Sequence, residues 1–233
     1  MKKRIWELDA FRGICIIGVV IVHFLYDLVE LFQIVDWHYP EWFLFIRNWG
    51  SMLFFLISGI CVTLGSRSVR RGLIVLGGGM LCTLATYCMY KFGGFHKSIM
   101  IYFGVLHCLG CCMLLWPLVK RLPTWVLVVL AIGLIALGVY IDEIPVGNPL
   151  LTAIGFRCPG FGASDHFPLL PYFGYFLAGS AIGRLVYRKK ESLLPSWEGH
   201  ILLRPFCFCG RHSLWIYLAH QPVAAGICYL LSL

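Results

Sequence analysis

Residues 7–27 read ELDAFRGICIIGVVIVHFLYD, an apolar stretch of membrane-spanning length that carries ionisable side chains along one face. Arg12 and His23 are eleven steps apart, which is close to three turns of an α-helix, so both side chains point the same way about 16 Å apart along the axis. Asp27 follows His23 by one turn and Glu30 by two. Because ionisable groups are costly in lipid, we expect this face to line a bundle interior or a water-filled cavity.

The rest of the chain has the same apolar character. Of its 233 residues, 60% are hydrophobic and only 13% are charged, which is typical of a membrane protein. We therefore predict an all-α fold, a polytopic transmembrane bundle of about seven spans that forms a single domain over residues 1–233. The predicted spans are 12–33, 43–64, 72–91, 100–118, 124–141, 168–186 and 212–231. The first is too long and too polar for a cleavable signal peptide, so we expect an uncleaved anchor.

The net charge of +8 follows the side of the membrane and does not indicate nucleic-acid binding. If the N-terminus lies inside, the only Lys and Arg residues on the outer side are Arg47, Lys91, Lys97 and Arg157. This positive-inside bias predicts a cytoplasmic N-terminus and, with seven spans, an outer C-terminus. We expect a multi-pass protein of a bacterial cytoplasmic membrane that contacts lipid and binds no nucleic acid.

Two connections are long enough to carry function. The outer segment 142–167 is rich in Gly and Pro and is a candidate substrate-facing loop. The inner segment 187–211 carries several bases and is expected to lie along the membrane surface, where bases favour anionic headgroups. In the third span, Gly77-Gly78-Gly79 is expected to permit close helix packing rather than to bind a phosphate.

The eleven cysteines indicate neither a disulfide framework nor a metal centre. Most of them lie within the predicted spans, and Cys108-x-x-Cys111 has no matching Cys/His pair at zinc spacing. We interpret them as small buried apolar side chains, and we expect no bound metal.

Further polar residues in or beside the predicted spans are candidates for a buried site. They are His38 in the first outer connection, His107 in the fourth span, Asp165 and His166 before the sixth, and Arg211, His212 and His220 at the seventh. Each has an ordinary structural explanation: a span histidine can bond a neighbouring helix, and His220 can satisfy carbonyls freed by a kink at Pro222. Their number favours a functional site, because ionisable groups within spans are uncommon.

The placement of these residues suggests acid–base chemistry on an anionic substrate. Histidine changes charge near physiological pH and can accept a proton from an attacking hydroxyl or amine. Asp27, one turn from His23, can orient that imidazole and stabilise its cation. Arg12 lies at the inner end of the same helix and can hold an anionic group such as a phosphate. These features predict an anion that enters from the cytoplasm and chemistry deeper in the membrane.

The motif at residues 7–13 with the Arg12–His23 spacing resembles the arginine-to-histidine signature of the acyltransferase-3 family, whose members acylate extracytoplasmic sugars. Three further segments resemble relatives of the heparan-α-glucosaminide N-acetyltransferase catalytic domain, and the ordered set covers nearly the whole chain. These segments are Gly104 to Gly110, Phe167-Pro168-Leu169-Leu170-Pro171, and Gly210-Arg211-His212-Ser213-Leu214 to His220-Gln221-Pro222.

The resemblance implies transfer of an acyl group from cytoplasmic acyl-CoA to an acceptor across the membrane. In the heparan enzyme the proposed catalytic histidine lies shortly before an aromatic-rich span that ends in a glycine. His38 occupies the matching place before Phe54 to Gly59. His23 stands where that enzyme carries an asparagine. The chain is also much shorter than that enzyme, so the acceptor need not be heparan.

We therefore expect an acetyl-CoA-dependent acyltransferase that acts on a sugar or glycan at the outer face. In this hypothesis Arg12 and Arg211 hold CoA phosphates. His38 is the first candidate for catalytic base or acyl acceptor and His23 the second, oriented by Asp27. His107, Asp165, His166 and His220 would line the cavity. N- or O-acylation, direct transfer or an acyl-histidine, and a homo-oligomer all stay open.

Two other classes of protein fit the same composition. A small proton-coupled secondary transporter would also use intramembrane His and Asp, but no pair of interrupted spans in corresponding halves indicates an inverted repeat. A non-catalytic membrane subunit would leave the polar face of residues 7–27 unexplained. Binding of acetyl-CoA by the purified protein would separate these classes.

Overall fold

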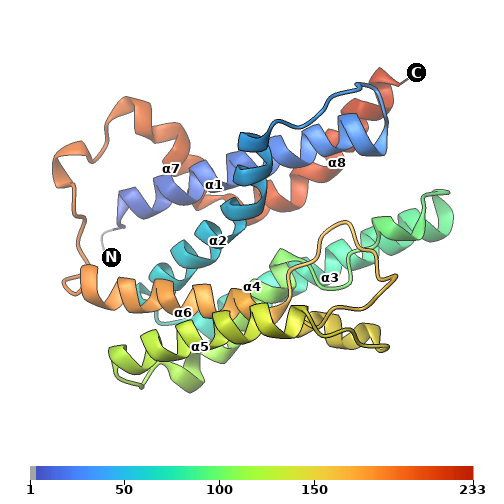
Figure 1. Cartoon of the computed structure of the whole chain (residues 1–233). Helices are drawn as coiled ribbons and strands as arrows, with labels where there is room; N and C mark the ends of the chain where they lie inside the picture. Colours follow the sequence, from blue (N-terminus) through green and yellow to red (C-terminus); the bar gives the residue numbers. More distant parts are fainter. Residues whose placement is uncertain (1–3, 233) are drawn as a thin grey trace. The chain divides into compact units, whose positions relative to one another are not determined.

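The computed structural model describes residues 4–232, and within them the chain is helical, with eight α-helices and short π- and 3₁₀-helical turns (Figure 1). The chain divides into two compact units. The first combines the residues up to Ile57 with those from Lys189 onward, and the second runs from Ser58 to Arg188. Helix α2 (Glu41–Leu64) contributes to both. A single domain over residues 1–233 stays a prediction.

The first unit is organised around α1 (Trp6–Tyr26), which continues as a π-helical turn at Asp27–Leu31. Helix α7 (Arg204–Arg211) packs along the first half of α1, and α8 (Ser213–Leu231) along the second half (Figure 1). Two 3₁₀ turns precede α7, at Pro195–Trp197 and Ile201–Leu203. Both ends of α1 therefore gain partners from the C-terminal part of the chain.

Besides the end of α2, the second unit contains four helices: α3 (Ser68–Phe92), α4 (Val105–Val119), α5 (Thr124–Asp142) and α6 (Leu169–Val186). Helix α3 packs on α4, and α5 lies beside α6 (Figure 1). Glycines permit these close approaches: a Cβ atom on Gly79 would stand 2.9 Å from Nδ1 of His107, and one on Gly138 would stand 2.6 Å from the backbone nitrogen of Pro171. Within the glycine triplet, Gly79 thus serves the predicted close helix packing, whereas nothing lies within 4 Å of a Cβ atom at Gly77.

Among residues 4–232, six helices are long and apolar enough to cross a membrane: α1 with its π-helical extension, α2, α3, α5, α6 and α8. The remaining predicted span, 100–118, corresponds to the 15-residue helix α4, which is shorter than this class requires. It starts only at Val105, because Asp165 accepts the Val105 amide and residues 100–104 are not helical. The first span begins at Trp6, earlier than the predicted residue 12.

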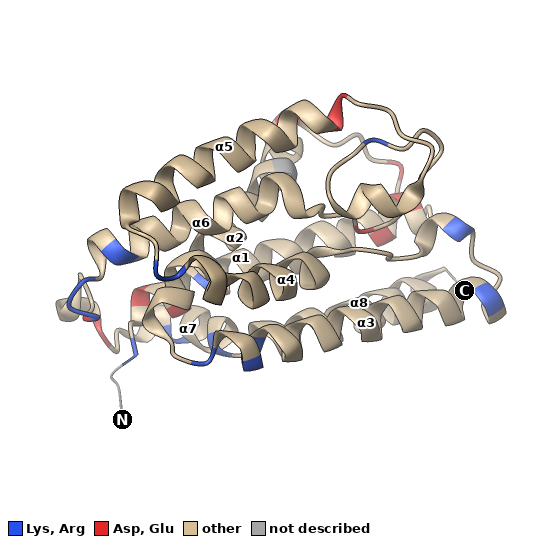
Figure 2. Ribbon diagram, turned by 90° about the horizontal axis from the view of Figure 1, so that it is seen from below, with Lys and Arg blue, Asp and Glu red and all other residues tan. Residues whose placement is uncertain are grey.

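The surface of the long helices matches a lipid environment. Val129 and Ile132 on α5 and Leu84 on α3 are among many large apolar side chains more than half exposed. Lys, Arg, Asp and Glu lie mainly near helix ends and in connections (Figure 2). With six candidate membrane helices, the chain is an integral multi-pass membrane protein.

The inner segment predicted at 187–211 contains α7, so part of it is anchored to α1. It also exposes several large apolar side chains close in sequence to its bases, namely Leu193, Leu194, Trp197, Ile201, Leu202 and Phe208. Such a mixture suits the boundary between headgroups and acyl chains. Contact of this segment with the membrane surface stays a prediction.

Candidate functional site

The start of α1 is tied to the segment that precedes α7. Glu7 is 5% exposed, and its two carboxylate oxygens accept hydrogen bonds from the Ser192 hydroxyl and the Leu193 amide, each at 2.8 Å. The Trp6 indole donates to the Leu194 carbonyl at 3.0 Å. The first residue of the motif at 7–13 is therefore structural, because it fixes the chain that leads into α7.

The last residue of the same motif lets α7 approach α1 backbone to backbone. A Cβ atom on Gly13 would overlap the Phe206 carbonyl oxygen, at 1.9 Å, and one on Gly210 would overlap the Asp9 carbonyl oxygen, at 1.7 Å. Only glycine fits at either position without moving a helix. This contact brings Arg211, at the end of α7, beside the first turns of α1.

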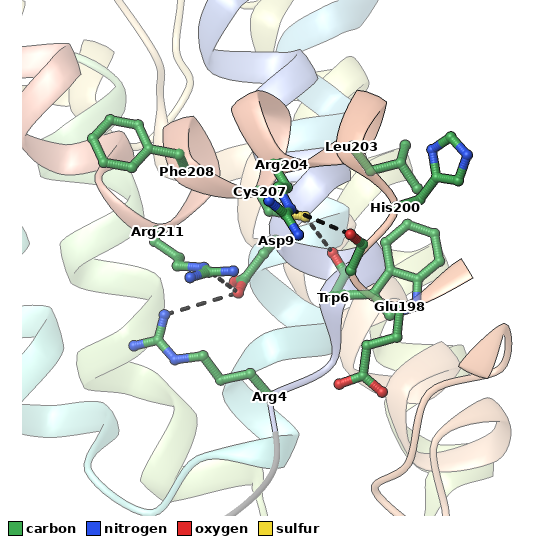
Figure 3. A pocket seen from close by; sticks show the side chains of 11 residues that line it. Arg4, Trp6, Asp9, Glu198, His200, Leu203, Arg204, Cys207, Phe208 and Arg211 are labelled. Carbon is green, nitrogen blue, oxygen red and sulfur yellow. Dashed lines mark hydrogen bonds and ion pairs between the residues drawn. The ribbon is translucent and has the colours of Figure 1, made fainter. Parts of the chain in front are cut away.

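Three arginines converge on one carboxylate at this contact. Asp9, whose side chain is 13% exposed, lies 3.5 Å from Arg211 Nε, 3.8 Å from an Arg4 nitrogen and 3.9 Å from an Arg12 nitrogen. Figure 3 shows Arg4 and Arg211 both directed at Asp9. One carboxylate cannot neutralise three guanidinium groups, so the cluster keeps a positive charge. The guanidiniums of Arg4 and Arg211 also stay accessible to an anion.

A cavity of about 510 Å³ opens beside this cluster (Figure 3). Its charged and polar walls come from Arg4, Arg204 and Arg211 with Asp9, Glu198 and His200, and its apolar walls from Trp6, Leu203, Cys207 and Phe208. Arg12 is not among the lining residues. Its guanidinium instead donates to the Gly210 carbonyl at 3.5 Å and forms an ion pair with Asp9, which does line the cavity. A pocket of this kind suits a ligand with anionic and apolar parts.

The cysteine in this pocket is not set up as a nucleophile. The Cys207 thiol donates to the Trp6 carbonyl at 3.5 Å. Burial raises the pKa of Cys207 above its ordinary value, although the nearby Arg211 opposes that shift. The thiol therefore stays protonated and packs as a small apolar group.

His23 and Asp27 are joined through a residue from α8. The Gln221 amide nitrogen donates to both carboxylate oxygens of Asp27, at 2.8 and 2.9 Å, and its oxygen lies 3.2 Å from His23 Nδ1. Asp27 is fully buried at the π-helical turn. Among the described residues, the link from Asp27 to His23 thus runs through a carboxamide rather than through the direct contact that the spacing suggested.

His220, the neighbour of Gln221, joins the same cluster. Its ring meets that of His23 edge to face, with centroids 4.9 Å apart, and its Nδ1 lies 2.5 Å from the Tyr217 carbonyl. The helix continues through Pro222, and His220 bonds a carbonyl in the turn before that proline. His220 therefore lies beside His23, and its bond to the Tyr217 carbonyl also suits a structural role. That His220 lines a substrate cavity stays a prediction.

His38 lies apart from these groups. It is exposed in the connection between the π-helical turn and α2, and its side chain makes no hydrogen bond to another described residue. Its neighbours Trp37 and Tyr39 pack against Phe43 at the start of α2. The aromatic packing therefore fixes the backbone around His38 while its imidazole faces outward.

In the second unit His107 is fully engaged. Its Nδ1 accepts the Gly104 amide at 3.2 Å, and its Nε2 lies 3.2 Å from the Thr83 hydroxyl, which itself donates to the Ile101 carbonyl at 2.7 Å. The Thr83 oxygen must then accept a hydrogen bond from the Nε2–H group of His107. Both ring nitrogens are thus satisfied by the fold, which supports the structural explanation for His107.

Asp165 and His166 close the same end of α4. Asp165 is 7% exposed and accepts the Val105 amide at 3.1 Å, a favourable place for a carboxylate at a helix N-terminus. Residue 166 pairs with Phe103 in a short β-bridge. Burial lowers the pKa of His166 below its ordinary value, opposed by Asp165, the Thr152 backbone and Asp142. These residues hold the loop at 142–167 onto α4.

The predicted site residues therefore fall into two groups, one in each unit. The first unit holds Arg12, Arg211, His23, Asp27, His38 and His220, and the second holds His107, Asp165 and His166. Within residues 4–232 no group of three or more His, Cys, Asp or Glu side chains could hold a metal ion. No disulfide joins any of the eleven cysteines, all of which lie within residues 4–232.

Sequence reasoning missed the partners that make each group work. Asp9, Arg4 and Arg204 belong to the arginine pocket, and Gln221 links Asp27 to His23. Asp9 and Gln221 both stand inside quoted motifs, at 7–13 and 210–222, so the signal was present. The contacts of Asp9 with Arg211 and of Gln221 with Asp27 and His23 were not deducible, because each joins residues about 200 positions apart.

A comparison with known protein families finds a match that covers nearly the whole chain. Residues 4–222 match the family model described as heparan-alpha-glucosaminide N-acetyltransferase, catalytic. No curated protein and no solved structure matches the chain. The family match spans the whole pocket and the His23–Gln221–Asp27 cluster, and it confirms the resemblance seen in the motifs. The chain belongs to the heparan-α-glucosaminide N-acetyltransferase catalytic family, whose members are membrane acetyltransferases that use acetyl-CoA.

Proposed function

We propose that the protein moves an acetyl group from cytoplasmic acetyl-CoA to a sugar or glycan at the outer face of the membrane. The observation that carries this proposal is the arginine pocket at one end of α1, together with a buried histidine–carboxylate cluster near the other end. The family supplies the reaction class, and the two groups on α1 supply places for the donor and for the chemistry.

The donor would bind with its phosphates at the arginines. Arg4, Arg204 and Arg211 line the cavity and can offer bidentate hydrogen bonds to phosphate oxygens. Arg12 would act through Asp9, which it shares with Arg4 and Arg211. The apolar walls at Trp6, Leu203 and Phe208 suit the less polar parts of a nucleotide-linked thioester.

The chemistry needs a base for the acceptor or a transient acyl carrier. A histidine would take the proton of the attacking hydroxyl or amine as the new acyl bond forms, and the thioester C–S bond would break to release CoA as its thiolate. His38 and His23 are the two candidates. His38 is supported by its place in the motif order, and His23 by its oriented and partly buried ring.

The proposal also includes a cytoplasmic N-terminus. Arg4, Arg204 and Arg211 line the pocket, and this gathering of bases supports a donor site on the side where positive charge is retained. His107, Asp165 and His166 would then support the outer loop at 142–167 rather than contact the donor.

Transfer in proteoliposomes with a mixed glycan acceptor pool tests the proposal. We expect the parent protein to bind acetyl-CoA. In single-turnover assays the bound acetyl-CoA should lose its acetyl group to the acceptor. His38→Ala or His23→Ala should lower the rate about 10²–10⁴-fold, as loss of a positioned base does, while acetyl-CoA binding stays intact.

A parent that binds acetyl-CoA and neither transfers nor hydrolyses it would contradict the proposal. In that case proton-coupled transport becomes the better reading, because the buried Asp27 and its two histidines would also serve a proton pathway.

A further inference from the structure

The carboxylate of Asp27 determines which way the Gln221 carboxamide lies. An ionised carboxylate only accepts hydrogen bonds, so the amide nitrogen of Gln221 must face it, and that nitrogen lies 2.8 and 2.9 Å from the two oxygens. The carboxamide oxygen is then left for His23 Nδ1, at 3.2 Å. Because an amide oxygen only accepts, the His23 ring must donate from Nδ1.

From this geometry we propose that Gln221 is a positioning residue for acetyl transfer, one that holds His23 in the Nδ1–H tautomer so that Nε2 can accept a proton. The inference rests on the proposed function with His23 as the base. A neutral imidazole carries one ring proton, so a proton fixed on Nδ1 leaves the lone pair on Nε2. Gln221 thus passes the orienting effect of Asp27 to His23 without placing a charge against the ring.

The local structure is built for this relay. Asp27 is fully buried and is the first residue of a π-helical turn that contacts α8. Such turns are uncommon and frequently occur at functional sites. The other titratable groups around the relay are His220, whose ring contacts His23, and Tyr26 and Cys228, which interact electrostatically with Asp27, with Glu30 beside Tyr26.

A purely structural Gln221 would satisfy Asp27 in the same way, so the test must report the tautomer of His23. Asp27→Asn replaces an acceptor by a group that also donates, and Gln221 can then turn its nitrogen toward His23 and favour the other tautomer. The double variant Asp27→Asn with Gln221→Glu exchanges the two groups, so that the carboxylate is at position 221 and the amide at position 27. The new amide at 27 donates to Glu, and Glu accepts from Nδ1, which restores the original tautomer.

We expect Asp27→Asn to lower kcat about 10²–10⁴-fold, the range seen when a base is lost or held in the wrong tautomer. The exchange variant, with both substitutions, should recover at least tenfold of that loss. The acid limb of its pH–rate profile should move to higher pH, because a carboxylate directly on the imidazole stabilises its cation. Acetyl-CoA binding should be unchanged in all variants. Gln221→Met, which keeps the volume and removes the hydrogen bonds to Asp27 and His23, should lower kcat with the same unchanged binding.

Equal losses in Asp27→Asn and in the exchange variant, with an unmoved pH profile, would overturn the role of Gln221. A parental kcat in Gln221→Met would also overturn the role of Gln221. This variant provides the test if Asp27→Asn does not fold. Near-parental transfer by His23→Ala would end this inference while acetyl transfer through His38 stands. A parent with no acetyl transfer would instead contradict the proposed function itself.

Discussion

Gly13 of α1 and Gly210 of α7 face each other with their backbones in contact: a Cβ atom on Gly13 would stand 3.1 Å from the Gly210 nitrogen, and one on Gly210 would stand 3.0 Å from the Gly13 nitrogen. This contact sets the position of α7. Through it, residues almost 200 positions apart assemble the arginine cluster around Asp9.

Gly210→Ala should therefore separate α7 from α1 and weaken acetyl-CoA binding. Overpacking of a close contact costs about 1–3 kcal/mol, and the backbone atoms it meets cannot yield as a flexible side chain would. Gly18→Ala in α1 is the matched control, because nothing lies within 4 Å of its added Cβ. It should be neutral or stabilising, since alanine favours a helix over glycine by about 1 kcal/mol. Thermal unfolding in detergent and acetyl-CoA titration measure both, and equal behaviour of the two variants would contradict the packing argument.

Arg211→Ala and Arg12→Ala should both weaken acetyl-CoA binding, for different reasons. Arg211 lines the cavity, and losing a charge-assisted bond of about 1.5–3 kcal/mol corresponds to roughly tenfold or more in Kd. Arg12 supports Asp9 from behind, so Arg12→Lys should restore only part of the affinity, because lysine lacks the planar fork. The exposed Arg67 lies outside the pocket, and Arg67→Ala is the control. If Arg211→Ala and Arg12→Ala both bind acetyl-CoA like the parent, the cavity is not the donor site.

The packing of His107 against α3 gives a second matched pair of glycines. Gly79→Ala would place a Cβ atom 2.9 Å from the His107 ring, whereas nothing lies within 4 Å of a Cβ at Gly77. We expect Gly79→Ala to lower the melting temperature and Gly77→Ala to leave it unchanged or slightly raised. The fraction of protein that stays monodisperse after heating reports this. If Gly79→Ala left the melting temperature unchanged, α4 would be free to shift. That result would contradict a His107 ring held in place by its hydrogen bonds.

Acidification should destabilise the second unit through His166. Burial lowers the pKa of His166 below the ordinary value of 6.5, so the unfolded chain takes up the proton before the folded one does. Stability is then complete above pH 6.5 and falls as pH drops from there toward the lowered pKa of the folded state. His166→Gln should flatten this part of the profile, measured as melting temperature against pH in detergent. Parallel profiles for parent and variant would refute the assignment to His166.

Sidedness can be tested by labelling single cysteines in a background without the eleven native ones. We expect a cysteine at position 70 to react only from the cytoplasm and one at position 142 only from outside, because positive charge is retained inside. Reaction of both from one side would contradict the cytoplasmic N-terminus.

Much of the fold follows from local pattern. Apolar runs of membrane-spanning length predicted the six long helices, and most of the predicted ends lie within a few residues of the observed ones. The reason is that backbone hydrogen bonding and bilayer thickness dictate helix length in lipid. The pattern failed at the start of α1, where Glu7 and Asp9 look too polar for a span. Their charges are compensated by Ser192, Leu193 and Arg211, which no local window contains. It also overestimated α4, whose start depends on a cap from Asp165.

The sequence by itself determined the class of protein, its family and the types of residue at its site, since hydropathy, motif order and ionisable groups in apolar segments are properties of short stretches. Only the tertiary structure decided which of those residues act together. It placed three arginines on Asp9, engaged both nitrogens of His107 in the fold, and set Gln221 between Asp27 and His23. Those pairings depend on close backbone approach between helices far apart in the chain, and on hydrogen-bond directions that spacing along a single helix does not contain.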